Sequence, residues 1–152
     1  MSDQDNDTEI DLTDPARGGV FFVVEDDLEP LASQATGQAL FVGRTSLKDC
    51  RGKDDLLRRL ADSWQLPATF GHNWDALADC VCDFDWLKAP GYLLLFEHAE
   101  DLRNANEEDF DTLLDILDEA AEGWLDDNVP FFAFFALPEH AFNDPAFNDP
   151  DN

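Results

Sequence analysis

The sequence predicts an α/β domain built on a mostly parallel sheet. Residues 92–96 and 131–136 are continuous apolar runs, which is typical of strands covered on both faces. Between and before these runs, apolar residues recur every three or four positions, the spacing of amphipathic helices. Buried strands that alternate with helices indicate a parallel sheet flanked by helices.

The individual elements follow from the same patterns, taken in chain order. Residues 19–25 combine β-branched and aromatic side chains and predict an extra N-terminal strand, which we expect at the edge of the sheet. A polar connection through Glu29 and Pro30 leads to a second strand at residues 38–43. The elements expected next are a helix near 53–64, an acidic helix from 73 to about 84, the strand 92–96, a short helix near 100–105, a longer helix at about 107–125 and the strand 131–136.

The length of 152 residues is that of a single domain with flanking segments. Residues 1–17 are acidic and rich in turn formers, so we expect them to be disordered. Residues 18–37 form an N-terminal extension that carries the extra strand, and residues 38–138 form the main domain. Residues 139–152 contain Ala-Phe-Asn-Asp-Pro twice, which predicts a flexible tail.

The charge of the chain restricts its partners. Nine basic residues against 35 acidic ones give a net charge of −26. Binding to nucleic acid phosphates or to an anionic membrane needs clusters of Lys and Arg, so neither is expected. Six of the nine basic residues lie between positions 44 and 59, whereas 17 acidic residues lie between 72 and 127. This separation favours a basic partner, although a solvated acidic surface without a specific partner is the simpler interpretation.

Cysteine and histidine give no sign of a cofactor. Three cysteines are too few and odd in number for a disulfide framework, and Cys80 and Cys82 lack the two-residue spacing of zinc motifs. We therefore expect neither a metal nor another cofactor, and we expect reduced thiols. No signal peptide or transmembrane segment is evident, which predicts a cytoplasmic protein.

The stretch from Leu66 to Cys80 is the most informative part of the chain. Asn73 is a good N-cap for the predicted acidic helix, and Asp75 falls in its first turn, where the helix dipole favours an anion. Asp79 and Asp83 follow at four-residue steps, so the three carboxylates share one stripe. Like charges at this spacing cost about 0.2–0.5 kcal/mol per pair, and a helix that breaks local rules in this way indicates a functional surface.

This stretch, Leu66-Pro67 followed by Phe70-Gly71-x-Asn73-x-Asp75-Ala76-Leu77-x-Asp79-Cys80, resembles the barstar family, the intracellular inhibitors of barnase-type secreted ribonucleases. The order of predicted elements from about residue 38 to 137 agrees with that family. The resemblance implies a barstar-like domain at residues 38–138, with a small parallel sheet of three strands and about four helices. The strand at 19–25 is then an addition to the family's fold.

The resemblance also implies a partner-binding surface. Asp75 and Asp79 match the family's two inhibitory aspartates, of which the second imitates a substrate phosphate, and Glu119 matches a further acidic contact. Phe84 or Trp86 could replace an aromatic contact at the rim. The surface expected on this basis consists of Asp75, Asp79, Glu119, Gly71, Asn73, Trp74, Thr69 and Phe84. Thr69 stands where the family has an aromatic contact, and Trp74 and Ala78 also depart from its pattern, so the target nuclease is left open.

Structural interpretations compete with these roles. Asp75 would also complement the start of a helix, Asp79 could pair with an arginine of the preceding helix, and Trp74 could belong to the core. The inhibitor interpretation requires that both aspartates face outward without being neutralised by the protein's own guanidinium groups.

Two other classes of function compete with inhibition. Paired carboxylates also serve glycosidases, but no nucleophile elbow, phosphate loop or metal-ligand set accompanies them, so we do not expect an enzyme. An immunity protein against a nuclease toxin, or an acidic nucleic-acid mimic that binds another basic partner, remains the alternative. We expect the free protein to be a monomer.

Overall fold

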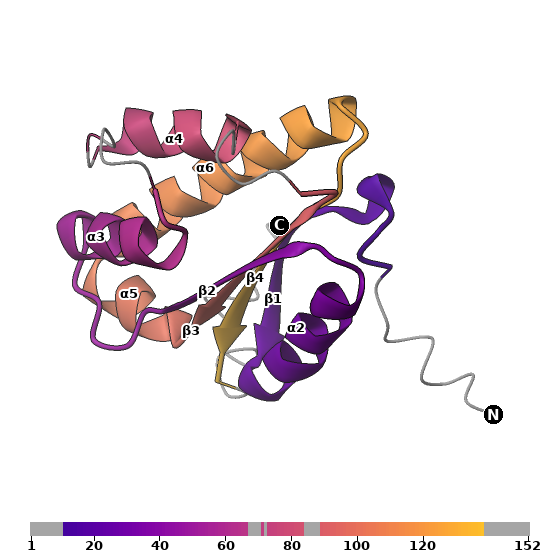
Figure 1. Ribbon diagram of the computed structural model, residues 1–152. Helices are drawn as coiled ribbons and strands as arrows, with labels where there is room; N and C mark the ends of the chain where they lie inside the picture. Colours follow the sequence, from indigo (N-terminus) through magenta and orange to yellow (C-terminus); the bar gives the residue numbers. More distant parts are fainter. Residues whose placement is uncertain (1–10, 67–70, 72, 84–88, 139–152) are drawn as a thin grey trace, which may run out of the picture.

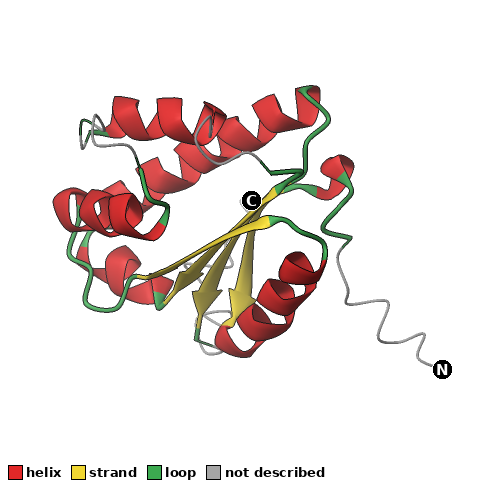
Figure 2. Cartoon of the chain, viewed as in Figure 1, coloured by secondary structure: helices red, strands yellow, loops and turns green. Residues whose placement is uncertain are grey.

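The computed structural model describes residues 11–66, 71, 73–83 and 89–138. Its centre is a fully parallel sheet of four strands (Figures 1 and 2), namely β1 (Gly19–Val24), β2 (Phe41–Ser46), β3 (Tyr92–Glu97) and β4 (Phe131–Leu137). The strand order is β1-β4-β3-β2. The predicted α/β fold with a parallel sheet is confirmed, and the strand added at the N-terminal side lies at the sheet edge as expected.

Five α-helices are described, together with the short 3-10 turns η1 (Pro15–Arg17) and η2 (Glu25–Asp27). The helices are α2 (Leu28–Gly37), α3 (Lys53–Ser63), α4 (Trp74–Asp83), α5 (Ala99–Ala105) and α6 (Glu107–Asp126). Helices α3 to α6 share one hydrophobic cluster on one face of the sheet, and α2 contributes to a second cluster on the other face (Figure 1). The sheet is therefore the middle of three layers.

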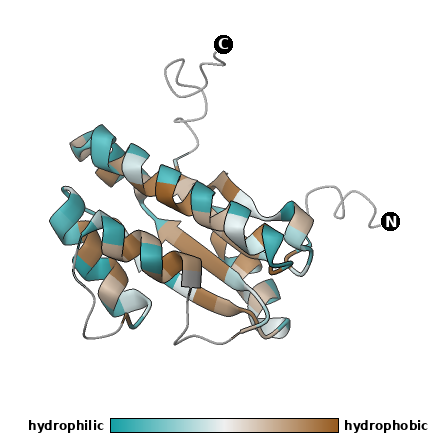
Figure 3. Cartoon of the chain, turned by 90° about the horizontal axis from the view of Figure 1, so that it is seen from above, coloured by the Kyte–Doolittle hydropathy of each residue, from teal (hydrophilic) through white to brown (hydrophobic). Residues whose placement is uncertain are grey.

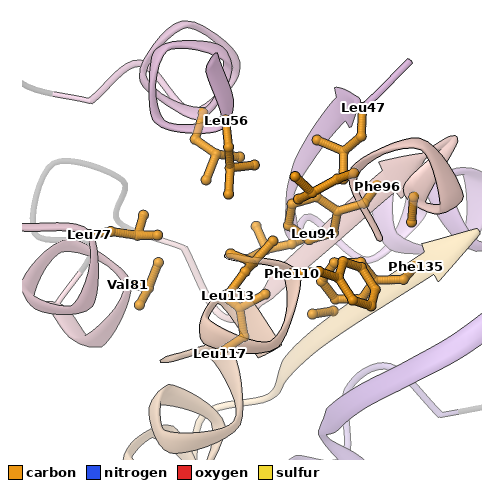
Figure 4. Packing of buried hydrophobic residues seen from close by; sticks show 14 of the residues in the cluster. Leu47, Leu56, Leu77, Val81, Leu94, Phe96, Phe110, Leu113, Leu117 and Phe135 are labelled. Carbon is orange, nitrogen blue, oxygen red and sulfur yellow. The ribbon is translucent and has the colours of Figure 1, made fainter. Parts of the chain in front are cut away.

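The two clusters divide the side chains of the central strands. Leu94 and Phe96 of β3 belong to the first cluster, whereas Leu93 and Leu95 belong to the second, as the two-residue period of a strand requires. In the first cluster the ring of Phe96 stacks on that of Phe135 with centroids 4.3 Å apart (Figure 4). These strands need no polar face because helices cover both sides, which explains their continuous apolar runs.

The segment expected to be a polar connection is the helix α2. Pro30 lies in its first turn, where a backbone N–H has no partner within the helix, so proline is tolerated there. Leu28 and Ala35 are buried against the second face of the sheet. The expected start of the second strand at residue 38 is also corrected to Phe41, because Gln38 and Ala39 complete the end of α2, with Ala39 in the left-handed conformation at φ 64°.

The N-terminal strand protects β4. All six residues of β1 pair in parallel with β4, and Phe21 and Phe22 pack on opposite faces against Phe134 and Phe135. Without β1, the seven buried apolar residues of β4 would form a sheet edge, which is a template for aggregation.

Residues 11–17, which belong to the segment predicted to be disordered, have defined structure. Leu12 is fully buried in the second cluster. The side chain of Asp14 caps the turn η1 by accepting the N–H of Ala16 at 3.0 Å. The expectations for residues 1–10 and 139–152 lie outside the described residues. In the part of the chain that is described, no helix combines the length and the apolar character that crossing a membrane demands.

Candidate partner-binding surface

The start of α4 is fixed by Asn73. Its side-chain Oδ1 accepts the backbone N–H of Ala76 at 2.7 Å, and its backbone carbonyl accepts that of Leu77 at 3.0 Å. Its Nδ2 donates to the carbonyl of Gly71 at 3.3 Å, which ties the helix to the preceding loop. The N-cap predicted for Asn73 is confirmed. Gly71 suits this place because a Cβ there would lie only 3.1 Å from the Asn73 Nδ2.

Helix α4 has one buried face. Leu77 and Val81 are fully buried and point toward Leu113 and Leu117 of α6 (Figure 4). The side chain of Trp74 is partly buried and packs against the same cluster. The core interpretation of Trp74 therefore has direct support from its packing.

The opposite face of α4 carries the two aspartates. Asp75 and Asp79 are both exposed, and their four-residue spacing projects them from one side of the helix. Within the described part of the chain, neither carboxylate takes part in an ion pair. Among the residues that the structure describes, both aspartates therefore face outward and neither is neutralised by an arginine.

The arginines of the preceding helix have other partners. Arg59 of α3 binds Asp55 of the same helix at 3.1 Å and donates from Nη1 to the carbonyl of Ser46 at 2.8 Å. Arg58 also binds Asp55. The alternative in which Asp79 pairs with one of these arginines is therefore wrong in this structure.

Glu119 of α6 lies near the acidic face of α4. Glu119 is exposed. Its carboxylate and that of Asp79 both act on the thiol of Cys82, in the last turn of α4. Partial burial raises the pKa of the Cys82 thiol, and the nearby carboxylates of Glu119 and Asp79 raise it further because they disfavour a thiolate. Both carboxylates thus lie within electrostatic reach of one sulfur, which brings acidic residues of α4 and α6 to a common surface.

The outer side of α6 extends this acidic surface. Seen from above, the helix carries hydrophilic residues along its outer side (Figure 3). A shallow hollow on this side is lined by Thr112, Asp115, Ile116, Asp118, Glu119 and Glu122. The surface that contains Asp79 and Glu119 is therefore negatively charged over more than one helix turn.

The structure describes only some of the other residues predicted for this surface. Thr69, Phe84 and Trp86 lie outside the described residues. No grouping of three or more His, Cys, Asp or Glu suited to a metal ion occurs in the described ranges. In the part of the chain that the structure describes, Cys50, Cys80 and Cys82 form no disulfide bond.

One contact near this surface, a hydrogen bond made by Trp124, is not predicted by the sequence. The indole Nε1 of Trp124, in α6, donates a hydrogen bond to the carbonyl of Val81, in α4, at 2.7 Å. The helical period predicts that Trp124 faces inward, but the sequence carries no signal for its hydrogen-bond partner.

Comparison with known proteins identifies the domain. The family profile described as Barstar (barnase inhibitor) matches residues 40–136, well over half of the chain. No curated protein matches the chain. The matched range begins just before β2 and ends within β4, so β1 and α2 precede it. The chain belongs to the barstar family of barnase inhibitors.

Proposed function

We propose that this protein inhibits a barnase-type ribonuclease by inserting the acidic face of α4 into the active site of the nuclease. Asp79 takes the place of a substrate phosphate, Asp75 binds a second basic group, and Glu119 contacts the rim. Gly71, Asn73 and Trp74 flank these contacts, and Thr69 and Phe84 are proposed as further contacts from the family resemblance. The protein acts by occupying a site, without turnover.

The observation that supports this proposal is the exposure of Asp75 and Asp79 on one side of α4, where neither carboxylate has an ion-pair partner among the described residues. A ribonuclease must hold an anionic phosphodiester, so its active site collects cationic side chains. Carboxylates bound to such groups form charge-assisted hydrogen bonds, which are about twice as strong as neutral ones. Because α4 is already folded and capped, little conformational entropy is lost when these bonds form.

The charge of the molecule supports the same role. A net charge of −26 attracts a basic partner and raises the association rate at low salt. The same charge opposes self-association, which fits a free monomer. Three cysteines without a disulfide bond among the described residues fit a reducing compartment such as the cytoplasm.

The direct test is inhibition of RNA hydrolysis by barnase. We expect the wild-type protein to inhibit barnase, and Asp79→Ala to weaken the inhibition by at least about 30-fold, because truncating one partner of a buried charge pair costs about 2–5 kcal/mol. The matched control is Asp26→Ala, which removes the same charge from η2, at the opposite end of the molecule from α4 (Figure 1). This control should leave inhibition within about twofold of wild type because exposed charges outside the contact contribute little.

Two outcomes would contradict the proposal. If the two variants weaken inhibition equally, the effect comes from net charge and not from the face of α4. If the wild-type protein leaves barnase fully active but inhibits a nuclease toxin, the immunity protein of the alternative interpretation is the better description.

A further inference from the structure

The hydrogen bond from Trp124 to Val81 joins two helices at a defined point. Val81 lies near the end of the described part of α4. The Trp124 Nε1 donates to its backbone carbonyl at 2.7 Å, so a side chain of α6 is bonded directly to the backbone of α4. A hydrogen bond of this length is directional and fixes both the distance and the orientation of its partners.

Trp124 is itself held in place by its surroundings. Its ring packs against that of Tyr92, at the start of β3, with centroids 5.1 Å apart. Its backbone carbonyl accepts the N–H of Val129 at 2.8 Å, in the turn between α6 and β4. The indole is therefore a fixed point relative to the sheet and not a side chain that follows α4.

The buried contacts of α4 with α6, at Leu77 and Val81, are apolar and by themselves leave the relative position of the two helices less defined. Leu77 and Val81 pack between side chains of α6, and hydrophobic contacts of this kind are not directional. Two helices that share only apolar contacts keep more freedom to slide or rotate than helices joined by a hydrogen bond. A slide would change the separation between Asp79 on α4 and Glu119 on α6.

We propose that Trp124 is a positioning residue for partner binding: its hydrogen bond to Val81 sets α4 against α6 and thereby fixes the spacing between the α4 aspartates and Glu119. The expected effect on nuclease binding rests on the proposed function. The expected effect on the position of α4 concerns the free protein alone and is tested separately.

The test compares Trp124→Phe with Phe134→Leu. The first variant keeps an aromatic ring and loses the N–H donor. The second trims a fully buried ring in the cluster on the other face of the sheet, and it controls for a general loss of stability. Three quantities are measured: hydrogen exchange of the α4 amides, the pKa of Cys82 from NMR of ¹³C-labelled cysteine, and the affinity for barnase.

In the free protein we expect Trp124→Phe to speed exchange of the α4 amides by about five- to tenfold, since a hydrogen bond contributes about 1 kcal/mol. The pKa of Cys82 should fall toward its ordinary value as α4 moves away from Glu119. Adding Glu119→Gln should then lower this pKa less than it does in the wild-type background. Phe134→Leu should leave the Cys82 pKa and its response to Glu119→Gln unchanged.

Binding gives the functional part of the test. We expect Trp124→Phe to weaken barnase binding by about five- to tenfold and Phe134→Leu to leave it unchanged, because a fully folded variant keeps its contact surface. The inference is overturned if the two variants agree in exchange, pKa and affinity. If wild type does not bind barnase but exchange and pKa respond as expected, the proposed function fails and the positioning role in the free protein stands.

A second replacement protects the test against a loss of folding. Replacement of Trp124 by its benzothiophene analogue keeps the shape of the ring and places sulfur where the N–H was. We expect this variant to change exchange and the Cys82 pKa in the same direction as Trp124→Phe. A wild-type result for the analogue would overturn the inference, because the N–H would then have no positioning effect.

Discussion

Gly43 of β2 packs closely against Trp64, the residue that follows α3. A Cβ at this position would lie 2.6 Å from Cδ1 and Nε1 of Trp64, a fully buried ring, so an added methyl group has no space. We expect Gly43→Ala to lower the free energy of unfolding by about 1–3 kcal/mol through overpacking.

The matched control is another glycine. A Cβ at Gly123, within α6, meets no atom within 4 Å, so Gly123→Ala should raise the free energy of unfolding by about 0.5–1 kcal/mol through helix propensity. Urea unfolding of both variants measures the difference. Changes of the same sign would show that the Trp64 contact does not set the cost at Gly43.

At the scale of elements, Asp55 and Arg59 join α3 to the edge strand β2. Arg59 is held by Asp55 while its Nη1 donates to the carbonyl of Ser46 at the end of β2. Burial raises the pKa of Asp55, but hydrogen bonds and charges from Arg59 and Arg58 outweigh burial and leave this pKa below its ordinary value. A carboxyl whose pKa is lowered on folding stabilises the protein above its unfolded pKa, and this contribution is lost as the pH falls through the folded pKa.

Asp55→Asn is therefore expected to destabilise the protein at pH 7 and to cost progressively less as the pH falls below about 4. Chemical unfolding of wild type and variant between pH 7 and pH 3 measures this convergence. Glu108→Gln, an exposed carboxyl at the start of α6, is the comparison variant. A cost of Asp55→Asn that stays constant across this range would contradict the linkage.

The elements differ in how well the sequence predicts them. The apolar runs of β3 and β4 and the stripes of α3, α4 and α6 were predicted because burial alone explains their patterns. Helix α2 was missed because Pro30 signals a break unless its place in the first turn is known. The exposed aspartates of α4 follow from helical period, but the proximity of Glu119 depends on how two helices pack. The bond from Trp124 to Val81 depends on the same packing, so no local pattern reveals it.

At the scale of the whole molecule, the sheet with its core supports the structure, and the helices on one face carry the acidic surface. The sheet and the clusters on its two faces give a rigid support, and β1 and α2, which precede the family match, cover one edge and one face of the sheet. Helices α4 and α6 lie on the other face and present acidic residues to solvent (Figure 1). This division lets the acidic surface accumulate like charges, because the core and not the surface supplies stability.

The most direct test of the central claim is a double-mutant cycle between Asp79→Ala and removal of a cationic side chain in the barnase active site. If Asp79 binds that side chain, affinities should give a coupling energy of more than about 1 kcal/mol, as expected for groups in contact. The same cycle with Asp26→Ala should give no coupling beyond about 0.5 kcal/mol, the scatter for independent sites. Equal coupling for Asp79 and Asp26 would contradict the account, since Asp79 would then act only through its charge and not from within the nuclease site.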